Sequence, residues 1–134
     1  MENFTPNYLA ILVAALSTFV IGGLWYSPIL FVNVWMKELG LTTEKQKSAS
    51  MLKVMGGSFL LSLFAAYNLS MMFGGKFSFE EGILYGFLTG FGFVSTALGT
   101  IYLFEQKTLK LFLINAGYQC VAFTVMGAII AAWK

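Results

Sequence analysis

The side chains of this sequence that could do chemistry inside its apolar stretches are neutral. Asn68, Asn115 and Gln119 lie within long apolar runs, and Tyr118 directly precedes the last of these amides. Amides and phenols both donate and accept hydrogen bonds. The set can therefore either hold helices together as an intramembrane polar cluster or line a small cavity for a neutral or zwitterionic solute.

The residue types that the sequence lacks exclude most catalytic and metal sites. It contains no His, Asp or Arg, and its one cysteine, Cys120, falls within an apolar run. Catalytic triads, histidine zinc sites and arginine clamps on phosphate need those residues. We expect no catalytic residue, no metal and no cofactor, and eight Lys against six Glu provide no basic patch for nucleic acid.

Glu80 and Glu81 are the remaining candidates for acid–base chemistry. They are adjacent and follow Ser78, which with Glu81 forms a capping-box pattern at the start of a helix. Carboxylates at such a position stabilise the helix dipole. An intramembrane enzyme that uses these carboxylates or tyrosines is the weakest alternative.

Four uncharged segments must position the polar side chains. No charged residue occurs between Glu2 and Lys37, Lys53 and Lys76, Glu81 and Glu105, or Lys110 and Lys134. About twenty apolar residues suffice to cross a bilayer as a helix. The sequence therefore predicts an all-α membrane protein, one domain over 1–134. Its four transmembrane helices should form a tight bundle, with spans of about 7–26, 52–73, 82–104 and 109–133.

A short helix after the first span is expected to lie in the membrane interface. Ser27 is a preferred N-cap and Pro28 suits the first helical position, so this helix should occupy about 28–39 and end at Gly40. Its apolar residues recur at helical spacing, which suits a helix lying in the interface. Trp25, Tyr26 and Trp35 favour the headgroup layer.

Two segments of the sequence resemble a known family. The first is an aromatic and proline motif that includes Gly23, Trp25, Tyr26, Pro28 and Trp35. The second lies near the end of the chain and includes Asn115 and Tyr118. On these residues the sequence resembles the small bacterial integral membrane proteins catalogued as domain of unknown function 1761. The resemblance implies a four-helix membrane protein and supplies no activity or substrate.

From the residues alone, the aromatic motif has two interpretations. It can anchor the first helix at a fixed depth in the interface. Alternatively, it can form a docking site for a lipid headgroup or a partner protein.

Small residues recur at intervals of four along each span. The clearest row is Gly82, Gly86 and Gly90, which shares one helix face and lets another helix approach closely. Gly92, Thr96 and Thr100 continue the pattern on a nearby face. The glycines serve either packing within the chain or contact with a second chain.

The lysines predict the orientation in the membrane. Six of them fall on one side of the four spans and two, Lys76 and Lys134, on the other. Positively charged loops stay on the cytoplasmic side, so both termini should lie outside. We expect a multi-pass protein of the bacterial inner membrane.

These features favour a non-enzymatic oligomer or an accessory subunit of a membrane complex. The expected partners are the lipid bilayer and either further copies of the chain or another membrane protein. The alternative is a carrier or channel for small solutes or lipids, assembled as an oligomer.

Overall fold

The structure is a computed structural model that describes residues 4–40 and 51–133, and these residues form helices and turns without a strand. Four of the helical stretches are long and apolar enough to cross a membrane. They are Tyr8–Trp25, Leu52–Phe73, Phe79–Phe104 and Leu109–Ala132. The four long apolar helices that the sequence predicts are thus confirmed, and the third begins at Phe79, a few residues before the predicted start of its span.

The helices in chain order are α1 (Tyr8–Trp25), α2 (Val32–Leu39), α4 (Met51–Phe73), α5 (Phe79–Leu88), the π-helix η1 (Thr89–Ser95), α6 (Thr96–Phe104) and α7 (Leu109–Ala132).

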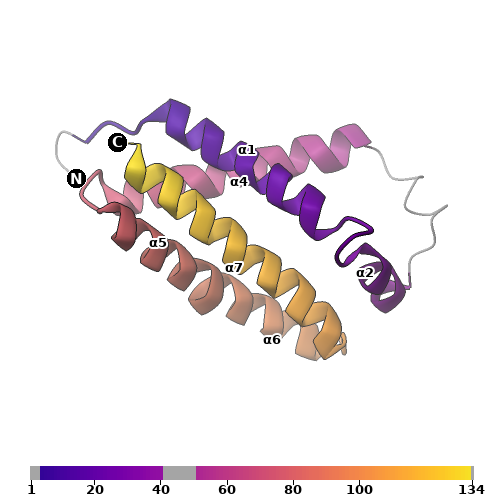
Figure 1. The fold of residues 1–134 in the computed structure, drawn as a ribbon. Helices are drawn as coiled ribbons and strands as arrows, with labels where there is room; N and C mark the ends of the chain where they lie inside the picture. The colour runs from indigo at the N-terminus through magenta and orange to yellow at the C-terminus, as the bar shows by residue number, and fades with distance from the viewer. Residues whose placement is uncertain (1–3, 41–50, 134) are drawn as a thin grey trace.

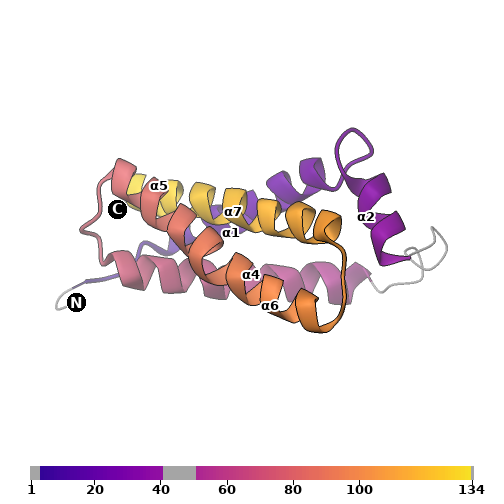
Figure 2. The same cartoon turned by 90° about the horizontal axis from the view of Figure 1, so that it is seen from below.

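Helix α7 is the central element of the fold. It contacts α1, α2 and α4 as well as all three segments of the third span. In Figure 1, α7 runs between α1 on one side and α5 and α6 on the other, and α2 lies at the end away from the two termini. Figure 2 shows α4 in a second layer. Every described helix is therefore fixed relative to α7.

The helix ends are set by the capping residues that the sequence contains. The Ser78 hydroxyl accepts from the Glu81 N–H at 3.2 Å, and the Glu81 carboxylate accepts from the Ser78 N–H at 3.0 Å. Thr108 caps α7 by a single bond, in which its hydroxyl oxygen accepts from the Leu111 N–H. Gly40 follows α2 with φ of 71°, a left-handed conformation that glycine adopts without strain. The predicted capping box is confirmed.

The prediction that the short helix begins at Pro28 is wrong. The chain makes a turn over 26–31, and α2 begins at Val32. The Phe31 N–H reaches back to the Trp25 carbonyl at 3.2 Å, and the Val32 N–H donates to the Ser27 carbonyl at 3.2 Å. The Phe31 and Trp25 rings also lie 5.1 Å apart. This contact holds the segment as a turn, although the Ser-Pro pair favours a helix start.

The third span is interrupted by η1, which the sequence analysis did not anticipate. Its backbone follows the i→i+5 pattern of a π-helix, which places more residues in each turn than an α-helix. The buried Ser95 hydroxyl donates to the Gly90 carbonyl at 2.7 Å, which matches this five-residue spacing. Residues after η1 therefore face a different direction from the one that a continuous α-helix would give.

A compact apolar core joins α1, α4 and α7. Ala14 and Ala66 are completely buried, and their small side chains let α1 and α4 approach each other. Leu69 and Met126 fill the space between these helices. The buried members of this cluster are Ile11, Ala14, Ala66, Leu69, Phe73, Met126, Ile130 and Ala131.

The glycine row of the third span lies against α7 of the same chain. Gly82, Gly86 and Gly90 are buried, and a Cβ atom at any of them would meet the α7 backbone. At Gly82 it would overlap the side chain of Ala131 and the carbonyl of Gly127. The two helices thus approach with backbone against backbone, and only glycine fits on this face.

Candidate functional site

The two family-like segments of the sequence pack against each other at one end of the bundle. Tyr26 directly follows α1, and its hydroxyl donates to the Asn115 side-chain oxygen on α7 at 2.6 Å. The Trp25 indole N–H donates to the Ile114 carbonyl at 2.8 Å. Residues that are 89 positions apart in the chain therefore form one polar and aromatic site, which we call the aromatic junction. It consists of Trp25, Tyr26, Trp35, Tyr102, Asn115 and Tyr118.

Asn115 is the polar centre of the aromatic junction. Its side-chain oxygen accepts from Tyr26, and its side-chain nitrogen donates to the Tyr102 hydroxyl at 2.7 Å. The phenols of Tyr26 and Tyr102 therefore meet at the two ends of one carboxamide.

Aromatic rings close the junction toward α2. The Tyr26 ring lies 5.4 Å from the Trp35 ring of α2 and 5.5 Å from the Tyr118 ring of α7. Ring pairs at these separations attract one another beyond the effect of burying their area. Trp35 thereby connects the short α2 to the bundle. The Thr108 hydroxyl adds a second connection by donating to the Glu38 carboxylate of α2.

Two glycines make room for the aromatic side chains. A Cβ atom at Gly117 would lie 2.9 Å from the Trp25 ring, which is closer than real Cβ contacts. One at Gly22 would lie 3.5 Å from the Tyr118 ring, an ordinary contact distance. The absence of a side chain at Gly117 therefore leaves the space on α7 that the Trp25 indole occupies.

The structure places the other predicted site residues outside this hydrogen-bond network. Gly23 and Pro28 are exposed, and nothing lies within 4 Å of a Cβ atom built at Gly23. Asn68 is exposed on α4 and does not join Asn115. Of the predicted polar cluster, the structure brings together Asn115 and Tyr118. The Asn115 amide and the Tyr118 ring both contact Tyr26.

Gln119 lines a separate pocket of about 150 Å³ between α1, α4 and α7. Thr18 and Ser62 lie opposite it, with their hydroxyl oxygens 3.1 Å apart. Tyr118 borders both this pocket and the aromatic junction, because its hydroxyl donates to the Thr18 carbonyl at 3.0 Å. We call this space the Gln119 pocket.

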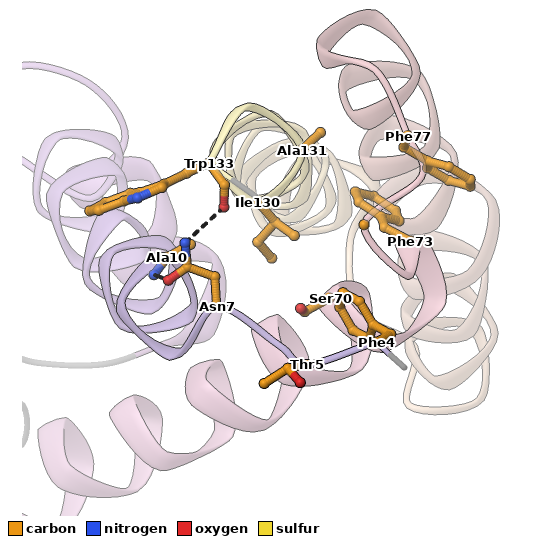
Figure 3. A pocket seen from close by; sticks show the side chains of 11 residues that line it. Phe4, Thr5, Asn7, Ala10, Ser70, Phe73, Phe77, Ile130, Ala131 and Trp133 are labelled. Carbon is orange, nitrogen blue, oxygen red and sulfur yellow. Dashed lines mark hydrogen bonds between the residues drawn. The ribbon is translucent and has the colours of Figure 1, made fainter. Parts of the chain in front are cut away.

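A smaller cavity of about 40 Å³ lies at the end of the bundle near the termini. Figure 3 shows the Ser70 hydroxyl, Phe73 and Ile130 around it. The Asn7 amide crosses its edge and donates to the Trp133 carbonyl at 3.1 Å. Asn7 also caps α1 by accepting from the Ala10 N–H. This cavity has space for a few water molecules only.

A third hollow is a groove of about 450 Å³ between α6 and the start of α7. The Thr96 and Thr100 hydroxyls on its wall donate to carbonyls of their own helix. Its lining therefore presents mainly carbon, which suits hydrocarbon rather than a polar ligand.

The described residues of the aromatic junction and of the Gln119 pocket can form hydrogen bonds, and none of them has a carboxylate or ammonium group. Among residues 4–40 and 51–133, no three His, Cys, Asp or Glu side chains group together in a way that could hold a metal ion. The chemistry that the geometry offers is recognition by neutral donors and acceptors.

Sequence reasoning missed Tyr102 and the pairing of Thr18 with Ser62. Tyr102 follows η1, so its direction depends on a π-helix that the sequence pattern does not reveal. Thr18 and Ser62 belong to the small-residue rows of the first and second spans, which gave the only signal for their contact.

Comparison with known proteins identifies a family for the chain. The family model described as "Protein of unknown function (DUF1761)" matches residues 9–131, which include both segments of the aromatic junction. No curated protein and no solved structure matches the chain.

Proposed function

This chain belongs to the DUF1761 family of proteins of unknown function, and from its geometry we propose that it is a non-enzymatic membrane protein that acts as an oligomer or as an accessory subunit of a membrane complex. We place it in the bacterial inner membrane with both termini outside. The support comes from how its polar groups and its apolar faces are used.

The polar groups of the aromatic junction are used within the chain. Asn115 has a phenol partner at each end of its amide, and the Trp25 indole is bonded to the α7 backbone. A network that satisfies its own members fixes the angles between helices and has few groups left for a substrate. This favours a structural role for the family-like residues.

The outer face of the third span carries the proposal. Only 11% of its apolar window is buried within the chain, against 33% for Leu109–Ala132, so most of this helix faces outward. Gly92 is exposed with nothing within 4 Å of a Cβ atom, and Phe93 beside it is 73% exposed. The Thr96 and Thr100 hydroxyls already donate to their own helix. A face of this kind lets another helix pack closely in lipid.

The test is purification of the tagged protein in mild detergent at native expression, followed by native mass spectrometry. We expect a defined homo-oligomer or a stoichiometric partner protein. A Leu at Gly92 should reduce that assembly, because its side chain would separate the helices. The control is Gly57→Leu on α4, another glycine with nothing within 4 Å of a Cβ atom. A monomeric wild-type protein without a partner would overturn the proposal.

A second candidate, a carrier or channel for small solutes or lipids, is supported by the Gln119 pocket. A carrier needs a water-filled path, so cysteines at Ser17, Asn68, Thr89, Asn115 and Gln119 should react with water-soluble thiol reagents after Cys120 is replaced by Ala. Protection of all five positions would exclude this function.

A further inference from the structure

The Gln119 pocket combines a polar floor with an apolar rim. Thr18, Ser62, Tyr118 and Gln119 supply its polar atoms, whereas Leu61 and Phe123 are among its apolar neighbours. Its volume of about 150 Å³ resembles that of cavities that hold one benzene-sized molecule. None of the described residues that line it carries a charge.

The Gln119 amide forms no hydrogen bond with the residues that the structure describes, although its neighbours on α7 are bonded or buried. Its side chain is half-buried at the pocket wall. This half-buried carboxamide has two donor hydrogens and an acceptor oxygen without a partner among the described residues, so all three are open to a bound molecule.

The hydroxyl protons of the pocket are already used by the protein. The Thr18 hydroxyl donates to the Ala15 carbonyl at 2.7 Å, and the Tyr118 hydroxyl donates to the Thr18 carbonyl at 3.0 Å. Since the Thr18 proton is committed, Ser62 must be the donor in the 3.1 Å contact between their oxygens. The oxygens of Ser62 and Tyr118 can therefore still accept, and only the Gln119 amide can still donate.

We propose that the Gln119 pocket binds a small neutral molecule that carries a hydroxyl or carboxamide group. Such a group donates to the surplus acceptors of the pocket and accepts from the Gln119 amide. A ligand that only accepts would leave Ser62 and Tyr118 without a donor, and an ion would lack a counter-charge. The inference goes beyond the proposed oligomer or accessory role and requires neither assembly nor transport.

The rim indicates how the molecule would enter. Leu61 borders the pocket and is 72% exposed, so the pocket is open past α4. If the four long helices cross a membrane as proposed, this opening faces the lipid. The ligand is then a molecule that dissolves in the bilayer and inserts its polar group first.

Side-chain amide resonances of ¹⁵N-glutamine provide a direct test on the wild-type protein in detergent micelles. The chain contains three glutamines, Gln46, Gln106 and Gln119. Benzyl alcohol should shift the Gln119 resonance in a saturable way, while the exposed Gln106 resonance stays in place. Toluene has the same ring without the hydroxyl. The toluene concentration needed to shift the Gln119 resonance should be about tenfold higher, since one hydrogen bond changes affinity by about that factor.

The matched variants are Gln119→Leu and Thr124→Val. The first removes the free amide at similar volume and should lower the affinity for 4-fluorobenzyl alcohol, measured by ¹⁹F NMR, about tenfold. The second changes a half-buried hydroxyl on the same helix that bonds to the Cys120 carbonyl and does not line the pocket, so affinity should stay unchanged. Affinities for the alcohol that equal those for 4-fluorotoluene, or that survive in Gln119→Leu, would overturn the proposal.

If Gln119→Leu does not fold, the wild-type resonances decide alone. A Gln119 signal that benzyl alcohol and toluene move at equal concentrations indicates partition into the micelle and excludes the site. Because this test reads one side chain, it can fail while the assembly experiment succeeds, and the reverse also holds.

Discussion

Tyr26 and Asn115 form a 2.6 Å hydrogen bond between the end of α1 and the interior of α7. Tyr102 of α6 bonds to the other end of the same amide. One carboxamide therefore joins α1 to the α6–α7 pair, which lies far from it in the chain, and its replacement has consequences for all three helices.

Replacing Asn115 by Leu should destabilise the protein more than replacing Tyr26 by Phe. Tyr26→Phe removes one hydrogen bond, worth about 0.5–1 kcal/mol in a membrane protein. Asn115→Leu leaves two phenols without this partner and should cost about 2–3 kcal/mol. Unfolding in detergent with increasing denaturant measures both, and the double variant should lose less than the sum. Strictly additive losses would mean that the two residues do not act together.

Gly86→Ala should be far more damaging than Gly92→Ala, although each adds one methyl group to the same span. The new Cβ at Gly86 would overlap the Phe123 carbonyl and lie 3.2 Å from the Thr124 Cα, so α5 and α7 must move apart. We expect a loss of about 2–3 kcal/mol. At Gly92 nothing lies within 4 Å, and Ala should be neutral or stabilise the helix by about 0.5–1 kcal/mol. Thermal denaturation in one detergent compares them, and equal losses would contradict the packing of α5 on α7.

Gly117→Ala should be rescued in part by Trp25→Phe. The added methyl group lies 2.9 Å from the indole ring and forces it to move. A phenyl ring is smaller, so the double variant should be more stable than Gly117→Ala alone by about 1 kcal/mol, even after loss of the indole hydrogen bond. Trp25→Phe alone is the control. A double variant that is less stable than both single variants would show that contact with the indole is not the reason why position 117 requires glycine.

Ser78→Ala should weaken the start of the third span, whereas Glu80→Gln should change little. Ser78 supplies one half of the capping box, and its loss typically costs about 1 kcal/mol. Glu80 is exposed and outside the box, so its charge contributes only a few tenths of a kcal/mol through the helix dipole. Amide hydrogen exchange near residue 79 reports the difference locally. The prediction fails if Glu80→Gln increases exchange as much as Ser78→Ala.

Reporter fusions at the two ends should show that both termini lie on the same side of the membrane, outside the cell. The Asn7 amide donates to the Trp133 carbonyl at 3.1 Å, so the two ends meet at one end of the bundle. The charge count then selects the outer side. Alkaline phosphatase should be active at both ends and a cytoplasmic fluorescent reporter at neither. A reporter result that differs between the two ends would exclude four crossings.

The sequence was sufficient for features that depend on local chemistry. Charge-free length located the four long helices, the Ser78 and Glu81 pair located the start of the third, and Gly40 located the end of α2. Each of these follows from residues close together in the chain. The same local reasoning failed at Ser27 and Pro28, because the Trp25 and Phe31 rings hold that segment as a turn.

The arrangement of the candidate site depends on how each helix is rotated about its axis, which local sequence patterns do not encode. Asn115 and Tyr118 were candidates on chemical grounds, but their pairing with Tyr26 requires α1 and α7 to face each other at one angle. Asn68 has the same chemistry and is exposed, because α4 turns it away from α7. The sequence shows which amides lie within apolar spans. Only the arrangement of the helices decides which of these amides finds a hydrogen-bond partner.

The π-helix η1 gives the third span the equivalent of a one-residue insertion. The part before it keeps its glycines in register with α7, and the part after it brings Tyr102 to Asn115. Deletion of a single residue within η1 would therefore restore a regular helix and leave the later side chains on their present faces. The same deletion elsewhere in the span would turn the later side chains away from their partners on α7, so η1 is the part of this span in which a change of length does least harm.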